Sequence, residues 1–143
     1  MDFLIEQIAP CGMNCALCSA FLARTHAIPK ARGTITHCLG CRIGNKRCAF
    51  LKKQCEKLLA GTVGYCYECE GFPCERLARI DRRYRRSYST SLIENLEQIR
   101  DFGIDAFFWN QKKRFLCPNC KTDVVSVHNG KCYSCDRVTS WRS

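Results

Sequence analysis

The sequence predicts a small, metal-rich α+β protein with an irregular cysteine-rich lobe, a helical middle and a C-terminal zinc-ribbon β-hairpin. Three observations support this fold class. Fourteen of the 143 residues are cysteines, none of them lies in residues 75–116, and two C-x2-C pairs near the C-terminus enclose an Asn-Gly turn signal. We therefore divide the chain into residues 1–74, 75–116 and 117–143.

So high a density of cysteines has two explanations, a disulfide scaffold or metal ligation. The N-terminal sequence MDFLIEQIAP lacks the basic start, long apolar run and small-residue cleavage site of a secretory signal. No run approaches the roughly 18 apolar residues of a membrane span. We therefore expect a cytoplasmic protein with no membrane partner, in which reduced thiols bind metal.

Five cysteine pairs have the C-x2-C spacing, which lets two thiolates turn back onto one metal ion. The pairs are Cys15/Cys18, Cys38/Cys41, Cys66/Cys69, Cys117/Cys120 and Cys132/Cys135. The formal net charge of the chain is +10, but a zinc ion held by four thiolates carries about −2. Several such sites would cancel much of the excess, so net charge alone does not indicate nucleic-acid binding.

The N-terminal segment has little regular pattern. Residues 16–24 suit a short helix, and residues 65–74 form a turn-rich knuckle. Residues 47–61 predict a longer helix, because their apolar residues fall near one face and Gly61 suits the C-terminal cap.

The middle segment predicts three helices. The first begins at residue 75, and the second begins with a capping box formed by Ser91 and Glu94 and ends at Gly103. The third covers residues 104–115. The side chains expected to pack in the core are Leu77, Ile80, Leu92, Leu96, Ile99, Phe107, Phe108 and Trp109.

Residues 76–86 concentrate six arginines against one acid, Asp81. Guanidinium groups bind phosphates bidentately, and neighbouring tyrosines can stack on bases. The face therefore suits contact with a protein or nucleic-acid partner. The same arginine pattern would also arise on a helix face that is merely solvated, or on one that screens the charge of nearby thiolate–metal sites. The arginines that helical spacing places on one face are Arg76, Arg79, Arg83 and Arg86.

The C-terminal segment contains CPNCKTDVVSVHNGKCYSCD, two knuckles joined by a predicted hairpin. Its four cysteines suit one tetrahedral Zn²⁺, and His128 is expected to be a turn residue outside this complete set. The predicted zinc ligands are Cys117, Cys120, Cys132 and Cys135.

The N-terminal cysteines begin with a C-x3-C-x2-C spacing, with which radical S-adenosylmethionine enzymes hold a [4Fe–4S] cluster. The 143 residues leave no room for the scaffold of such an enzyme, and the run typical of bacterial ferredoxins is absent. Spacing permits either Zn²⁺ or a [4Fe–4S] cluster here, with Zn²⁺ favoured. The expected ligands are Cys11, Cys15, Cys18, Cys38, Cys41, Cys66, Cys69 and Cys74, with Cys48 and Cys55 as further candidates.

We expect two N-terminal centres. In a continuous helix Cys48 and Cys55 would lie about 10.5 Å apart along the axis, too far to share one Zn²⁺. The preferred partition joins the pair Cys38/Cys41 to the pair Cys66/Cys69. The second centre would draw on Cys11, Cys15 or Cys18, and Cys74, together with Cys48 or Cys55.

The chain resembles an uncharacterised cysteine-rich family, domain of unknown function 3795, and in particular a subtype with a C-terminal zinc ribbon. The resemblance rests on CGMNCALC, CLGCR, RCAFLKKQCEKL and CYECEGFPCERL, and on RRYRRSYSTSLIENLEQIRDFGIDAFF with the closing CPNCKTDVVSVHNGKCYSC. It implies no activity, because none is assigned to the family. One departure is Lys121, where the resemblance leads us to expect a glycine.

No paired carboxylates, phosphate-binding glycine loop or nucleophile elbow indicates an enzyme. The sequence therefore favours a non-enzymatic metal-binding protein that acts as an adaptor for protein or nucleic acid. The alternative is an iron–sulfur redox or metal-relay protein with a [4Fe–4S] cluster in the N-terminal lobe.

Overall fold

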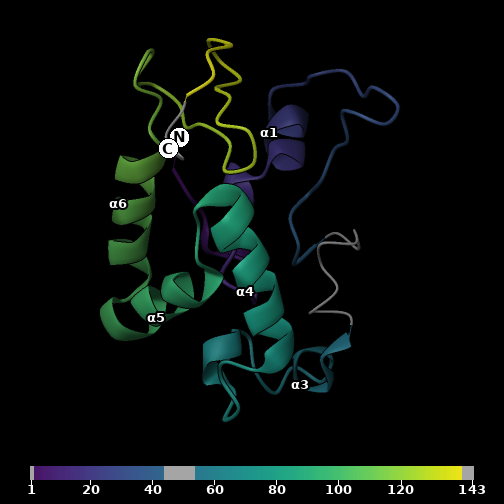
Figure 1. The fold of residues 1–143 in the computed structure, drawn as a ribbon, viewed down its shortest axis with the longest axis vertical. Coiled ribbons are helices and arrows are strands. Elements are labelled where there is room, and N and C mark those ends of the chain that lie inside the picture. The colour runs from purple at the N-terminus through teal and green to yellow at the C-terminus, as the bar shows by residue number, and fades with distance from the viewer. Residues whose placement is uncertain (1, 44–53, 140–143) are drawn as a thin grey trace.

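The computed structural model describes residues 2–43 and 54–139 (Figure 1). The described part contains α-helices and short 3₁₀ helices, and its β-structure is limited to isolated bridges. No helix in that part combines the length and apolar character needed to cross a membrane. The elements are η1 (Ile5–Gln7), η2 (Cys15–Leu17), α1 (Ser19–Thr25), α3 (Glu56–Leu59), η4 (Cys66–Glu68), α4 (Glu75–Tyr88), α5 (Leu92–Phe102) and α6 (Ile104–Phe115).

Helices α4, α5 and α6 confirm the predicted helical middle, with α5 packed between the other two (Figure 1). The Ser91 hydroxyl accepts a hydrogen bond from the backbone N–H of Glu94 at 3.1 Å and so caps the start of α5. Gly103 ends α5 with a φ of +88°, a conformation that favours glycine. Capping and chain reversal therefore follow from the local sequence.

A buried carboxylate on α4 joins this helix to the start of α5. Asp81 accepts hydrogen bonds from the Ser91 hydroxyl at 2.8 Å and from the backbone N–H of Ile93 at 3.0 Å. The Arg85 guanidinium donates to the same carboxylate at 2.6 Å. Because a buried charge requires partners, Arg85 supports the helix junction and is less available to the basic face.

Helix α6 buries a narrower face than the sequence suggested. Phe107 and Phe115 are fully buried, as expected of side chains eight residues apart on one helical face. Phe108 packs beside them in a half-buried position. The prediction that Trp109 packs in the core is wrong, because this residue is 66% exposed.

The predicted helix over residues 47–61 is not continuous. Helix α3 begins only after Cys55, whose backbone is extended, with φ −84° and ψ +118°. Gly61 follows α3 with a φ of +72° and suits the predicted cap. Cys48 lies outside the described residues, and the interruption at Cys55 removes the basis for separating these two cysteines along one helix axis.

The C-terminal segment folds back on the rest of the chain without the continuous hairpin that we expected. Within residues 116–139 the pairing consists of isolated antiparallel bridges between Leu116 and Val124, Val125 and Cys132, and Lys131 and Val138. The turn near Gly130 is closed by its N–H, which donates to the Ser126 carbonyl at 2.8 Å. Burial rather than a regular ladder therefore holds this segment.

A contiguous core includes residues from the N-terminal lobe, α4, α5 and the C-terminal segment. Gly12 marks a close approach within it, because a Cβ atom there would lie 2.6 Å from the Leu92 carbonyl oxygen and 2.8 Å from Leu96 Cγ. The Gly12 carbonyl accepts a hydrogen bond from the Asn95 amide at 3.0 Å. The cysteine-bearing turn thus rests directly on α5.

Candidate metal centre

Four cysteines at the C-terminus form a compact cluster that could hold a metal ion. Their sulfur atoms all lie within 4.8 Å of one another. The Sγ atoms of Cys117 and Cys135 are 3.7 Å apart, and so are those of Cys120 and Cys132. A tetrahedron with metal–sulfur bonds of about 2.3 Å has edges of about 3.8 Å. The predicted set of four is therefore brought together closely enough to hold a metal ion.

The backbone turns that position this cluster are the same in both pairs. Lys121 and Asp136, each directly after the second cysteine of a pair, have φ angles of +56° and +63°. The Lys121 N–H donates to the Cys117 carbonyl at 3.0 Å, and the Asp136 N–H donates to the Cys132 carbonyl at 2.8 Å. The left-handed conformation explains why a glycine was expected at position 121.

Hydrogen bonds from polar neighbours lower the pKa of the Cys120 and Cys135 thiols, whereas burial raises that of Cys132. The Thr122 hydroxyl and the Asn119 amide each donate a hydrogen bond at 3.4 Å, to the sulfurs of Cys120 and Cys135 respectively. The bond from Thr122 is the largest cause that lowers the pKa of Cys120 to about 6. Burial raises the pKa of Cys132 to about 12. A thiolate therefore forms most readily at the exposed rim, where a metal ion would enter.

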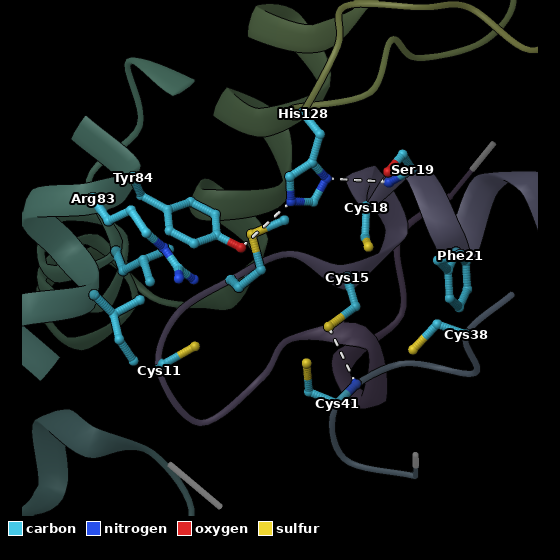
Figure 2. Close-up of a pocket in the computed structure, with 13 residues that line it drawn as sticks. Cys11, Cys15, Cys18, Ser19, Phe21, Cys38, Cys41, Arg83, Tyr84 and His128 are labelled. Atoms are coloured by element: carbon cyan, nitrogen blue, oxygen red, sulfur yellow. Dashed lines mark hydrogen bonds between the residues drawn. The ribbon is translucent and has the colours of Figure 1, made fainter. Parts of the chain in front are cut away.

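A second group of cysteines surrounds a cavity of about 190 Å³ in the N-terminal lobe (Figure 2). The cysteines that line it are Cys11, Cys15, Cys18, Cys38 and Cys41. Helix α4 contributes Ile80, Arg83 and Tyr84 to the lining, and His128 reaches in from the C-terminal turn (Figure 2). We call this cavity the cysteine chamber.

Local hydrogen bonds fix the backbone of the cysteine chamber. The Asn14 side chain accepts from the N–H of Ala16 at 3.1 Å and caps η2, the short helix that begins at Cys15. The N–H of Cys38 donates to the Ala20 carbonyl at 3.2 Å, which docks the loop carrying the second pair against α1. The two cysteine pairs are thus held on separate segments that face one space (Figure 2).

Two backbone N–H groups point at sulfur atoms in the cysteine chamber. The N–H of Cys41 donates to Cys15 Sγ, and the N–H of Gly40 donates to Cys38 Sγ, both at 3.3 Å. Burial raises the pKa of Cys18, which lines the same chamber, to about 11. A cation in the chamber would offset this desolvation.

The sulfur atoms of the cysteine chamber are more widely spaced than those of the C-terminal cluster. Among the described residues, the C-terminal four are the one group of three or more His, Cys, Asp or Glu residues whose ligand atoms lie within 4.8 Å of one another. The chamber cysteines do not meet that limit, although five of them line one cavity.

The remaining described cysteines lie toward α3 and η4. Burial raises the pKa of Cys66 to about 12, and the next causes are the neighbouring thiols of Cys11, Cys74, Cys55 and Cys69. The Gly71 N–H, and after it the Lys57 ammonium at 3.4 Å, lower the pKa of Cys69.

This arrangement differs from the expected partition of the N-terminal cysteines. The pair Cys38/Cys41 faces Cys15 and Cys18 across the chamber, instead of joining the pair Cys66/Cys69. The difference arises because the loop before Cys38 docks on α1. Sequence spacing contains no information on that contact.

The basic face of α4 is only partly the one that we expected. Three of its predicted arginines, Arg79, Arg83 and Arg86, are joined by Arg82 around a surface pocket next to Ile80. Arg76 instead donates to the Gln54 carbonyl at 3.0 Å. Because Arg83 also lines the cysteine chamber, the basic face and the chamber are adjacent.

His128 is a residue of the chamber wall that the sequence did not identify. Its Nδ1 accepts a hydrogen bond from the backbone N–H of Ser19 at 3.3 Å, and its Nε2 lies 3.4 Å from the Tyr84 hydroxyl. The ring also contacts Tyr88 edge-on, with 4.9 Å between ring centroids. Its position beside Asn-Gly predicted a turn, but a turn residue gives no signal for a contact with two distant helices.

The comparisons with known proteins agree with the cysteine pattern of the N-terminal half. A family model described as "Protein of unknown function (DUF3795)" matches residues 7–79. The match includes all ten N-terminal cysteines and ends before the C-terminal cluster. No curated protein and no solved structure matches the chain significantly.

Proposed function

Because this chain belongs to the DUF3795 family of proteins of unknown function, we propose its function from geometry: a non-enzymatic metal-binding adaptor. In this proposal a zinc ribbon with ligands Cys117, Cys120, Cys132 and Cys135 stabilises the C-terminal segment. The basic face of α4 binds a negatively charged partner, and the protein acts in the cytoplasm.

The observation that carries the proposal is the spacing of the four C-terminal sulfurs. The separations of 3.7 Å between sulfurs of opposite pairs match the edge of a tetrahedron around one ion. A [4Fe–4S] cluster would hold its cysteines farther apart, because each thiolate binds a different iron. A site of four thiolates is typical of structural Zn²⁺, with a single iron as the other candidate.

Four protein ligands also argue against catalysis at this centre. Catalytic zinc sites keep a coordination position for water or substrate, whereas structural sites fill all four positions with side chains. The bound ion would instead stabilise the fold, since the free energy of metal binding becomes folding free energy.

The adaptor part of the proposal rests on the exposed arginines of α4. Arg79, Arg82, Arg83 and Arg86 lie at i, i+3, i+4 and i+7, on one side of the helix, and line one pocket. Guanidinium groups clustered in this way bind phosphates or carboxylates bidentately.

Metal analysis of protein purified without added metal tests the proposed zinc ribbon. We expect one Zn²⁺ bound by the C-terminal cysteines and no visible absorption from that site. A single iron there would give a coloured site and would contradict the zinc assignment.

Binding of RNA and DNA at two salt concentrations tests whether the basic face of α4 binds nucleic acid. Replacing Arg79, Arg82 and Arg86 with Glu should weaken binding and reduce the magnitude of the slope of log K against log salt by about 2–3. The control replaces Arg24, Lys30 and Arg32, which are exposed on another part of the surface and give the same change in net charge. Equal loss in both variants, or no binding by the wild type at low salt, would reject nucleic acid as the partner.

A further inference from the structure

The cysteine chamber has features that the C-terminal cluster lacks. We propose that it binds a [4Fe–4S] cluster through the thiolates of Cys15, Cys18, Cys38 and Cys41. The proposal does not rest on the zinc ribbon, because the two groups of cysteines are separate in the structure.

The first argument is the set of ligands. Two C-x2-C pairs direct four sulfurs into the same cavity (Figure 2). One pair lies at the junction of η2 and α1, and the other lies in the loop that docks on α1. Iron–sulfur clusters of this type are held by four cysteine thiolates. Cys11 is a fifth cysteine in the wall, but its thiol also neighbours that of Cys66, which does not line the chamber. We therefore assign Cys11 to the wall and not to the ligand set.

The second argument is size. A single tetrahedral ion requires sulfurs about 3.8 Å apart, as in the C-terminal cluster, but no three chamber sulfurs among the described residues lie within 4.8 Å of one another. A cubane binds each thiolate through a different iron, so its sulfurs must surround the inorganic core at a distance. The cavity of about 190 Å³ is several times the roughly 30 Å³ of one water molecule. It therefore suits a group of several atoms better than one ion.

The third argument is the environment of the cavity. Met13, Phe21, Ile80 and Leu92 form apolar walls that limit access of water. The N–H groups of Gly40 and Cys41 donate to cysteine sulfurs, an interaction by which proteins tune the potential of such clusters.

Charge balance gives the fourth argument. An oxidised cluster with four thiolates carries about −2, and burying this charge requires compensation. Arg83 lines the chamber from α4 and supplies a positive charge, and its position on the basic face makes it accessible to a partner.

The test uses the full chain, purified anaerobically and reconstituted with ferric iron, excess thiol as reductant, and sulfide. We expect a brown protein with about four irons and four acid-labile sulfides per chain, and an electron paramagnetic resonance signal after reduction with dithionite. A wild-type protein that stays colourless after reconstitution, or that binds Zn²⁺ in the chamber in preference to iron, would overturn the proposal.

Paired variants then test the ligand assignment. Replacing Cys15 and Cys41 with Ser should abolish the visible absorption and the bound iron, while zinc at the C-terminal site is retained. Replacing Cys117 and Cys120 with Ser should have the opposite effect. Cys11→Ser is the matched control and should keep the cluster. Retention of the cluster in the Cys15/Cys41 variant, or its loss in Cys11→Ser, would overturn the assignment.

Alkylation of the wild-type protein avoids reliance on variants that fail to fold. In the iron-loaded protein Cys15, Cys18, Cys38 and Cys41 should resist a thiol-specific reagent, and chelation of iron should make them reactive. Equal reactivity of these four cysteines before and after chelation would contradict their role as ligands.

Discussion

The C-terminal cluster and the cysteine chamber are built from the same motif but differ in how the pairs meet. In the C-terminal cluster, sulfurs from opposite pairs lie 3.7 Å apart. In the cysteine chamber, two pairs and Cys11 surround a cavity of about 190 Å³. The two groups share the C-x2-C spacing, so the way in which the pairs meet distinguishes what they can bind.

The connection between the pairs explains the difference. Cys120 and Cys132 are joined by a short segment whose own turn returns the chain. Cys18 and Cys38 are joined through α1 and a longer loop that docks on this helix. A short connection brings two pairs into contact, and a connection that includes a helix leaves space between them.

Removing a ligand from the C-terminal cluster should have the largest effect. Cys132 is fully buried, and Cys132→Ser should release the bound metal and unfold residues 117–139, because the binding free energy of a structural zinc is on the order of 10 kcal/mol. Metal analysis and hydrogen exchange measure the two losses. Cys74→Ser, at an exposed cysteine far from this cluster in the sequence, should leave zinc in place. Zinc content unchanged in Cys132→Ser would show that the four cysteines do not hold it.

A substitution at Gly12 should disturb the N-terminal region and leave the C-terminal site intact. In Gly12→Ala the new methyl group would meet the Leu92 carbonyl oxygen and Leu96, which should lower the free energy of unfolding by roughly 1–3 kcal/mol. Gly33→Ala is a matched control, since Gly33 also has a positive φ but a methyl group there would have no neighbour within 4 Å. Denaturant unfolding measures both. Equal losses would mean that backbone strain, not the contact with α5, explains the effect.

His128→Ala tests whether the two regions support each other. The imidazole joins the C-terminal turn to the Ser19 N–H and to Tyr84, so its loss should cost about 1 kcal/mol of stability. It should also speed the loss of a bound cluster in air, because the chamber wall is opened. His37→Ala removes a histidine whose ring hydrogen-bonds the nearby Ile28 carbonyl, outside the chamber wall, and it should not alter cluster lifetime. Identical cluster lifetimes in the two variants would show that the C-terminal turn does not protect a cluster in the chamber.

The smallest expected effect is a gain in stability at the first C-terminal knuckle. Lys121 has a φ of +56°, and Lys121→Gly should relieve about 1 kcal/mol of strain. Metal affinity measured by competition with a chelator should rise by a factor of a few. Lys131→Gly, at a residue outside the left-handed region, should give no gain. A decrease in affinity in Lys121→Gly would show that the flexibility of glycine in the unfolded chain outweighs the strain.

Helical elements could be predicted from the sequence because their signals are local. The Ser91 cap, the stop at Gly103 and the buried positions Leu92, Leu96 and Ile99 all agree with the structure. Trp109 was misplaced because an aromatic cluster does not indicate which ring faces inward.

The set of four C-terminal cysteines followed from the sequence by itself, because two close pairs and one turn leave few other arrangements. The sequence also determined where the helices of the middle segment begin and where the second and third of them end. Each of these features depends on a few neighbouring residues.

Only the tertiary structure decided which N-terminal pairs face each other. Three contacts join segments that are far apart in the chain. The loop before Cys38 docks on α1, Gly12 contacts α5, and His128 reaches Tyr84. Such contacts depend on how helices pack and how loops close, and the spacing of cysteines specifies neither. For this reason the distance between pairs, and with it the group that the cysteine chamber can bind, became visible only in the folded chain.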